Sequence, residues 1–527
     1  MIMQLQNLPM LFDRGQAVVA LETPLTERMK VLEFLHKLAK SRSLPLYFWN
    51  QGYSQLQQID ESMRLVPSDT ECTSGFAWLL QHRNALGIFV FEGAISPDAV
   101  TGIFPPKTAA MLSNLAYDLT ANKGQQLLVC LESYIELPRE LVTLVPVLSY
   151  PLPNAIEVRQ TVRNLVESRF ELNVDRYFEI LIRTCLGLPM GELEMLLSRQ
   201  SGIAHSLEEL TNAVLAYKKS KLKGRGVEFI NEPDVPQAGG LDLLEEMLQR
   251  AATLLSPEAR KHNLQFPKGM ILWGPPGTGK SLSAKLAAKK IGVPMVAADW
   301  AGLRGATAYE SRKNLREFLQ FCDANSENGL VLYFDDFDKG FAGFDSDSDG
   351  GVSRQLAGKL LTWMQERTSQ VLMMATVNRL EFLPAELVRR FDDIIFVDLP
   401  HAGARYEIFK LHLAKYFPGL DFSDRDWLRL LRETKLLTPA EIALLVRKTA
   451  EEAFYRNTKQ FSRLEVGGQP LKVTVKDFLE QRYNFTPSMI REEDKIIEIR
   501  NKAVYARPAA SPDKSRWAKE PEVLFGS

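Results

Sequence analysis

The sequence predicts an α/β protein made of two consecutive modules, each an α/β block followed by a helical block. In residues 1–160 and again in residues 241–400, short apolar stretches of strand length alternate with amphipathic segments of helical period. Such alternation is typical of a mainly parallel sheet with helices on its faces. Only the second block contains a glycine-rich phosphate-binding motif, so only the second module is expected to bind a nucleotide.

The composition is that of a globular protein with several domains. Its 527 residues exceed what one hydrophobic core supports, and 64 Lys and Arg against 65 Asp and Glu leave a net charge of −1. This balance gives no support to a nucleic acid or an anionic membrane as partner. The four cysteines include no CxxC pair, and no apolar run approaches the roughly 20 residues that span a bilayer. A soluble cytoplasmic protein is therefore expected.

The predicted strands of the first block are continuous apolar runs rather than alternating ones, which suits a sheet covered on both sides. They are LPLYFW (44–49), GIFVF (87–91), LLVCL (127–131) and VPVLSY (145–150). Amphipathic segments at residues 27–40 and 107–121 are predicted helices between them. Residues 161–217 then follow a helical, lid-like pattern, with Gly187 as a predicted C-cap.

Residues 218–240 interrupt this periodicity and are predicted to be a linker. Their basic start, KKSKLKGRGVEF, has two interpretations, a nucleic-acid contact or a solvated linker. The second is favoured, because isolated charge runs usually lie in solvated segments.

The motif GPPGTGKS begins at Gly274 and matches GxxxxGK[ST] in full. A strand-like stretch, GMILW, precedes it and a helix-forming stretch, SLSAKLAAKK, follows it, which is the strand–loop–helix setting that a P-loop requires. We predict that this loop and the helix start bind ATP. The predicted ATP-binding residues are Gly274, Pro275, Pro276, Gly277, Thr278, Gly279, Lys280, Ser281 and Leu282.

Each residue type in the loop has a physical reason. The glycines let backbone N–H groups approach phosphate oxygens without a Cβ clash, and the helix N-terminus adds a partial positive charge. Lys280 is expected to bridge the β- and γ-phosphates, and the Ser281 hydroxyl to ligate Mg²⁺.

An acidic group on a neighbouring strand completes the prediction. The stretch GLVLYFDDFD, which lies downstream of Lys280, contains an apolar strand that ends in Asp335 and Asp336. Asp335 is expected to hold the metal, normally through water, and Asp336 to orient and deprotonate the attacking water. Taken alone, the two carboxylates could merely cap the next helix.

Two further sites follow in the sequence. The strand QVLMMATVN ends in Asn378, a polar side chain placed to sense the γ-phosphate or hold the water. In the stretch LPAELVRRFDDIIFVDLP, Arg389 and Arg390 stand where an arginine finger could emerge. The alternative for these two is a helix end whose dipole favours cations.

Together these features resemble the AAA ATPase family. More narrowly, the chain is similar to the AAA proteins of cyanobacteria and plastid genomes once called hypothetical chloroplast reading frames. The residues that carry this narrower likeness are LDLLEEML, NLQFPKGMILWGPPGTGKSLSAKLAA, LLTWMQE (360–366), VDLP (397–400) and ARPAAS. The likeness is dense over residues 239–400 and patchy to 511. Over residues 1–230 only the order of elements is similar.

The resemblance implies a fold and an assembly. The fold is a P-loop AAA module, a parallel sheet plus a helical lid, preceded by a degenerate AAA-like module without a P-loop. The lid is expected at residues 401–456, and a C-terminal extension at 457–527, with a poorly ordered polar tail from Arg507. A homo-oligomer, for which a hexamer is one arrangement, and an unknown protein client are implied as well.

The chain departs from the family at several positions. The family commonly has Glu where Asp336 stands, and it usually separates its two arginines with a glycine, whereas Arg389 and Arg390 are adjacent. Arg304 occupies the place of a pore aromatic, and Tyr309 lies out of that register. Pro439 replaces a glycine near the adenine, at the first helical position of a predicted capping box that Thr438 and Glu441 form.

Two functions follow as expectations. In the first, ATP hydrolysis drives remodelling of a protein partner that residues 1–230 recruit. In the second, the chain is a slow-turnover, ATP-dependent switch or adaptor. Asp336 and the missing pore aromatic favour the second, whereas the complete P-loop and Asn378 favour the first.

Overall fold

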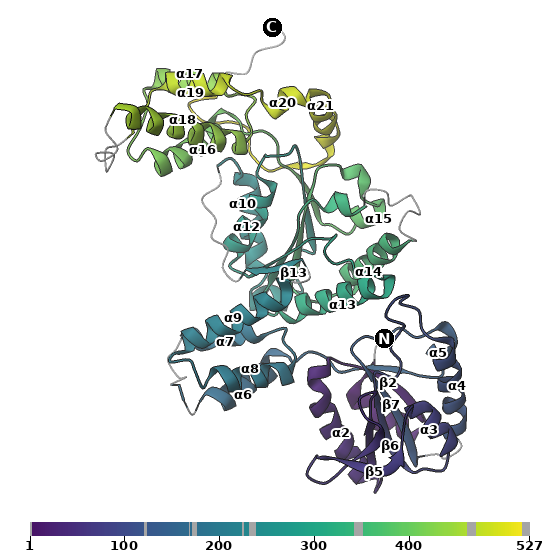
Figure 1. Cartoon of the computed structure of the whole chain (residues 1–527). Coiled ribbons are helices and arrows are strands. Elements are labelled where there is room, and N and C mark those ends of the chain that lie inside the picture. Colours follow the sequence, from purple (N-terminus) through teal and green to yellow (C-terminus); the bar gives the residue numbers. More distant parts are fainter. Residues whose placement is uncertain are drawn as a thin grey trace. The chain divides into compact units, whose positions relative to one another are not determined.

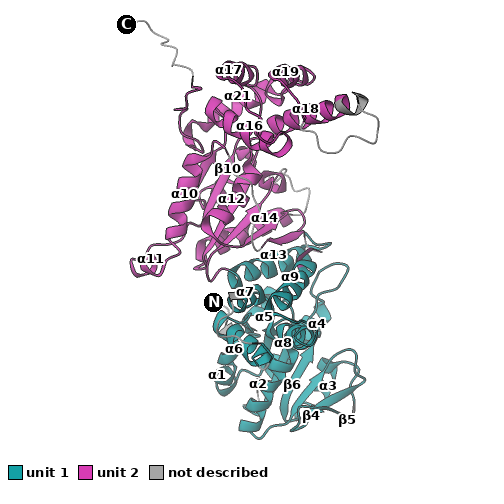
Figure 2. Ribbon diagram, turned by 90° about the vertical axis from the view of Figure 1, so that its left-hand side faces the viewer, with its two compact units in different colours: residues 1–221, 304–325 teal, residues 222–303, 326–527 magenta. Residues whose placement is uncertain are grey.

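The computed structural model describes residues 3–120, 124–167, 169–170, 176–223, 226–230, 239–341, 351–460 and 471–518. The chain forms two compact units. Unit 1 consists of residues 1–221 and 304–325, and unit 2 of residues 222–303 and 326–527 (Figure 2). Each unit is described by itself.

Unit 1 is built on a sheet that has eight strands within the described residues. Its order is β1-β8-β2-β7-β6-β3-β4-β5, with all neighbours parallel except the antiparallel β4 and β5 at one edge. The strands are β1 (Met3–Gln4), β2 (Val18–Glu22), β3 (Leu46–Trp49), β4 (Gln55–Ile59), β5 (Leu65–Glu71), β6 (Gly87–Glu92), β7 (Gln126–Glu132) and β8 (Val147–Ser149).

Helices cover both faces of this sheet. On one face Val19 and Leu21 of β2 pack with α1 (Leu8–Asp13) and α2 (Arg28–Ser41). On the other face Val18 and Ala20 pack with α3 (Gly75–Gln81), α4 (Pro106–Thr120) and α5 (Arg139–Val142). All residues of β6 and β7 are buried, as expected for the apolar runs predicted at 87–91 and 127–131. All five residues of β2 are buried as well, but this strand was not predicted.

A helical bundle follows the sheet in unit 1. Its helices are α6 (Ala155–Val166), α7 (Arg176–Cys185), α8 (Met190–Gln200) and α9 (Leu207–Lys223), and they share one apolar core. Gly187, the predicted C-cap, has a positive φ of 80° just after α7. The helix α13 (Ala308–Ala324) also belongs to unit 1, although its sequence lies between two strands of unit 2.

The predicted linker at residues 218–240 differs from what the structure shows. Its start is the last part of α9, where the Lys218 side chain is fully buried. Residues Val227–Ile230 form β9, which pairs antiparallel with β11 (Met295–Ala298). Val227 and Phe229 are buried and alternate with an exposed residue, a strand pattern that the charged surroundings obscured. Residues 231–238 lie outside the described residues.

Unit 2 contains a second parallel-rich sheet, with order β15-β14-β10-β13-β12-β11-β9. Its remaining strands are β10 (Gly269–Trp273), β12 (Leu330–Phe334), β13 (Val371–Val377), β14 (Asp393–Phe396) and β15 (Arg507–Pro508). The helices α10 (Asp242–Thr253) and α12 (Lys280–Ile291) pack against it over an apolar core (Figure 1). The other helices of this block are α11 (Pro257–Lys261), α14 (Val352–Glu366) and α15 (Ala385–Val388).

The two sheets share one strand order. In unit 1 the central strands run β8-β2-β7-β6-β3, and in unit 2 they run β14-β10-β13-β12-β11. Numbered along the chain, both series read fifth, first, fourth, third, second. In unit 2 the first strand leads into the glycine-rich loop, whereas in unit 1 it leads from Glu22 into a short 3₁₀ turn before α2. The predicted fold class, an α/β module with a P-loop preceded by an α/β module of similar strand order without one, therefore agrees with the structure.

A lid of helices completes unit 2. It consists of α16 (Ala402–Tyr416), α17 (Asp424–Glu433), α18 (Pro439–Gln460) and α19 (Val475–Tyr483), packed around a core that contains Trp427, Phe409 and Phe478. The short α20 (Ser488–Arg491) and α21 (Glu493–Lys502) follow. Among the helices that the structure describes, none has the length and hydropathy needed to cross a membrane.

The tail from Arg507 is ordered up to residue 518, contrary to the expectation. β15 extends the sheet beside β14, and the Ala509 amide donates to the carbonyl of Phe396 at 3.0 Å. The Ala509 carbonyl accepts from the Leu244 amide at 3.1 Å, and Trp517 is buried in the lid core. Backbone hydrogen bonds at a sheet edge need no apolar periodicity, so the sequence pattern could not reveal them.

Candidate nucleotide-binding site

The glycine-rich loop has the backbone that phosphate binding requires. It runs from the end of β10 to the start of α12, and Gly274, Gly277 and Gly279 have φ values of 155°, 80° and 98°. These are left-handed conformations that other residues adopt only with strain. A Cβ on Gly274 would also overlap the carbonyl oxygen of Val397. The loop therefore presents backbone N–H groups at a helix N-terminus.

Lys280 is the first residue of α12, and its amine lies inside the loop. The Nζ donates to the carbonyls of Gly274 at 2.7 Å and Pro275 at 2.9 Å, and to Oδ1 of Asn378 at 2.9 Å. Burial lowers the pKa of Lys280 to about 8, and the charge of Asp336 opposes this shift. The predicted lysine and the predicted γ-phosphate sensor are thus in direct contact.

Asp335 follows β12 and lies beside Ser281. Its Oδ1 accepts from the Ser281 hydroxyl at 3.3 Å, from the Thr376 hydroxyl at 2.7 Å and from the Asp336 amide at 3.1 Å. Burial acts to raise the pKa of Asp335, but the hydrogen bonds, led by that of Thr376, lower it overall. A carboxylate and a hydroxyl oxygen at this distance are the hard ligands that Mg²⁺ prefers, so the residues present fit that ion.

Asp336 occupies a left-handed conformation with φ of 44°. Its Oδ1 accepts from the Asn378 side-chain amide at 2.8 Å, and its Oδ2 pairs with the Lys339 amine at 2.6 Å. Aspartate tolerates this backbone region better than most residues with a Cβ. The carboxylate predicted to orient water is therefore linked through Asn378 to Lys280.

Two polar residues at this site were missed in the sequence. Thr376 is 1% exposed, and its hydroxyl also accepts from the Asp336 amide at 2.9 Å. Asp338 is 3% exposed, and its oxygens accept from the backbone amides of Asn378 at 3.3 Å and Arg379 at 3.1 Å. Burial raises the pKa of Asp338. Thr376 lies two residues before Asn378, on the same face of a strand, and this spacing could have revealed it.

The first turn of α18 lies against the glycine-rich loop. Thr438 and Glu441 form the predicted capping contacts, with the Glu441 amide donating to the Thr438 hydroxyl at 3.2 Å and Glu441 Oε2 accepting from the Thr438 amide at 2.9 Å. A Cβ on Gly277 would lie 3.1 Å from Oγ1 of Thr438. Pro439 begins the helix, as predicted, so the lid meets the loop through a rigid first turn.

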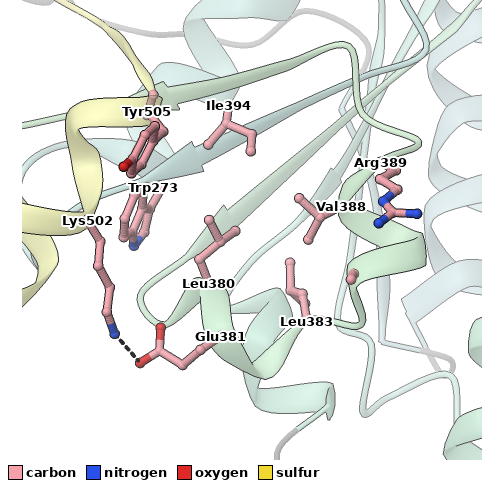
Figure 3. A pocket seen from close by; sticks show the side chains of 11 residues that line it. Trp273, Leu380, Glu381, Leu383, Val388, Arg389, Ile394, Lys502 and Tyr505 are labelled. Atoms are coloured by element: carbon pink, nitrogen blue, oxygen red, sulfur yellow. Dashed lines mark ion pairs between the residues drawn. The ribbon is translucent and has the colours of Figure 1, made fainter.

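Arg389 and Arg390 are not joined to this network. Both are exposed at the end of α15, and within the described residues neither guanidinium has a hydrogen bond or ion pair. Arg389 instead lines a mostly apolar cavity of about 450 Å³ together with Trp273 and Tyr505 (Figure 3). An ion pair between Lys502 and Glu381, 3.8 Å long, lies at its edge.

Comparisons with known proteins agree with this geometry. Residues 270–399 match the model of the ATPase family associated with various cellular activities (AAA). An uncharacterized AAA domain-containing protein ycf46 of Trieres chinensis is 32% identical over 336 residues, which is 62% of this chain and 66% of that protein. The ycf46 protein of Pyropia yezoensis is 28% identical over 67% of this chain and 71% of its own length. A Cell division cycle protein 48 homolog of Archaeoglobus fulgidus is 30% identical over 49% of this chain and 37% of its own length.

Proposed function

Because the chain belongs to the AAA family, we propose that it binds ATP with Mg²⁺ and hydrolyses it to ADP and phosphate in order to remodel a protein partner. One observation carries this proposal. A continuous set of hydrogen bonds joins Lys280 of the loop to Asn378 and Asp336, and a second joins Ser281 to Asp335.

Each residue of the network has a proposed role. The Lys280 amine exchanges its carbonyl contacts for the β- and γ-phosphate oxygens, which also stabilises its charge. Ser281 and Asp335 would hold Mg²⁺, which would supply neutralisation of the charge that develops on the phosphates. Asp336 aligns and deprotonates the attacking water, and Asn378 reports the γ-phosphate to it.

The likeness to AAA proteins and the position of two arginines support a homo-oligomer. Arg389 and Arg390 have no partner in their own chain among the described residues, and arginines that stabilise transferring phosphoryl groups are commonly supplied in trans. We propose a homo-oligomer in which one of them reaches the nucleotide of a neighbouring subunit.

A slow-turnover switch is the second candidate. Both carboxylate oxygens of Asp336 already have partners, Asn378 and Lys339, and its side chain is one methylene shorter than glutamate. A carboxylate held away from its water by about 1 Å loses roughly 100-fold in rate.

Steady-state ATP hydrolysis by the purified chain decides between the two. Lys280→Ala and Asp336→Asn are compared with Lys285→Ala, an exposed lysine on the same helix, as the matched control. Turnover of about 1 s⁻¹ or more, lost in the first two variants and kept in the control, supports a working ATPase. Tight ATP binding with barely detectable turnover, indifferent to Asp336→Asn, supports the switch.

A further inference from the structure

The first module carries carboxylates where the second carries its nucleotide-binding residues. Glu22, Glu92 and Glu132 end the strands β2, β6 and β7 of unit 1 and are only 6%, 6% and 8% exposed. The strands at the same positions of the other sheet are followed by the glycine-rich loop, by Asp335 and by Asn378. Three carboxylates at one strand-end edge repel phosphate, so this edge suits a cation rather than a nucleotide.

We call Glu22, Glu92 and Glu132 the acidic edge. Some of its carboxylate oxygens accept hydrogen bonds from other residues of the first module. Arg28 donates from Nε to Glu92 at 2.7 Å, and Asn50 donates to the same carboxylate at 2.9 Å. Ser96 donates to Glu132 at 2.6 Å. Burial raises the pKa of Glu132 because it destabilises the ionised carboxylate, and the nearby charge of Lys313 opposes this shift.

The helix α13 supplies that charge. Tyr309, Arg312, Lys313 and Arg316 recur at spacings of three and four residues and therefore share one face of the helix. Arg316 Nη2 lies 2.9 Å from Oε1 of Glu22. The other three residues of this face contact the segment 133–136, which follows β7. The contacts are Lys313 to the Ser133 hydroxyl at 2.8 Å, Arg312 to Glu136 at 2.8 Å, and the Tyr309 hydroxyl to the Tyr134 carbonyl at 2.8 Å.

The other end of α13 is held by the helical bundle of unit 1. The amine of Lys218, which is fully buried, donates to Oδ1 of Asn325 at 2.7 Å and to the Leu186 carbonyl at 2.8 Å, and lies 5.1 Å from the ring centroid of Phe321. A Cβ on Gly187 would overlap the side-chain amide of Asn325, so the close approach of the backbone at Gly187 to Asn325 requires a glycine. α13 is thus anchored at both ends by residues 1–221 (teal in Figure 2).

We propose that the first module binds α13 in place of a nucleotide and, through α13, controls ATP turnover by the second module. Only the short segment 325–329 separates the end of α13 from β12, and β12 leads directly to Asp335 and Asp336. In this proposal the link between α13 and β12 is covalent, through the segment 325–329. The control of turnover rests on the proposed ATPase function, whereas the binding of α13 does not.

The test exchanges the charges of one contact. Arg312→Glu and Glu136→Arg each place like charges at this contact, and the double variant restores an ion pair of opposite charges with the positions exchanged. Each single variant is expected to speed hydrogen exchange of the amides of residues 308–324 and to lower turnover severalfold, and the double variant is expected to restore both. The Arg159–Glu179 pair on the helical bundle, exchanged in the same way, is the matched control and leaves both unchanged.

Nucleotide stoichiometry tests the other half of the proposal. One ATP analogue per chain is expected for the natural sequence and none for Lys280→Ala. Two bound nucleotides per chain of the natural sequence would show that the first module is also a nucleotide site and would overturn the proposal, as would unchanged hydrogen exchange in the single variants. Altered hydrogen exchange with unaltered ATP turnover would show that α13 does not control turnover. A chain that hydrolyses no ATP refutes the proposed function, while exchange and stoichiometry still decide whether α13 replaces the nucleotide.

Discussion

At the scale of single residues, the site depends on side chains that hold two partners at once. Asn378 accepts from Lys280 and donates to Asp336, and Thr376 donates to Asp335 and accepts from the Asp336 amide. An amide and a hydroxyl can do this because each has both donor and acceptor capacity. Removing the Asn378 side chain therefore disturbs Lys280 and Asp336 together, and removing the Thr376 hydroxyl disturbs the Asp335 carboxylate and the Asp336 amide together.

Asp336→Asn separates chemistry from backbone strain. Asparagine also tolerates the left-handed conformation at φ of 44°, so the fold should be kept, whereas the carboxylate that deprotonates water is lost. We expect turnover to fall about 100-fold or more with the melting temperature nearly unchanged. Asp336→Ala, which lacks the local hydrogen-bonding group, should lower both quantities. Full activity in Asp336→Asn would contradict the assigned role.

Thr376→Val keeps the shape of the side chain and removes its hydroxyl. Asp335 then loses a 2.7 Å hydrogen bond, and the buried Asp336 amide loses an acceptor. We expect about 1–3 kcal/mol less stability in urea unfolding and a higher Mg²⁺ concentration for half-maximal turnover. Thr376→Ser retains the hydroxyl and serves as the control. An unchanged Mg²⁺ requirement in Thr376→Val would argue against Asp335 as the metal ligand.

At the scale of elements, α9 carries a buried lysine, Lys218, that should make stability depend on pH. Burial lowers the pKa of Lys218 from 10.5 to about 7. Between these values the folded chain binds fewer protons than the unfolded chain, so the free energy of unfolding rises with pH above about 7. The urea midpoint should be higher at pH 8.5 than at pH 6.5. Lys218→Met should reduce this rise, and Lys219→Met, an exposed neighbour, should not. Equal rises in all three proteins would exclude Lys218 as the source.

At the scale of the whole molecule, Arg389 and Arg390, which have no partner among the residues that the structure describes, predict cooperation between subunits. A chain with Lys280→Ala keeps Arg389 and Arg390, and a chain with both arginines changed to alanine keeps its own ATP site. If an arginine acts in trans, each variant alone should be nearly inactive and their mixture should recover a measurable part of the activity. The single changes Arg389→Ala and Arg390→Ala then identify the one required. An active double-arginine variant would contradict a finger at this position.

Sequence reasoning succeeded where structure is local. The glycine-rich loop, the apolar strands and the capping box of Thr438 and Glu441 are each defined by neighbours in the chain, and all are present. It missed features set by distant contacts. β15 depends on backbone bonds to a strand far away in the sequence, and Asp338 accepts from the backbone amides of Asn378 and Arg379, just after β13. The burial of Lys218 depends on a helix from another part of the chain, so a charged sequence was interpreted as linker.

Unit 1 is discontinuous in sequence, and this has a consequence for synthesis on the ribosome. Its last segment, residues 304–325, is made only after residues 1–221 of the same unit and residues 222–303 of the other unit. At a usual elongation rate, the stretch 222–325 takes about 5–20 s to appear. During that interval Arg316 and Arg312 have not yet been made, so Glu22 and Glu136 lack these ion-pair partners. The nascent chain then exposes an acidic surface to which a basic partner can bind before α13 does.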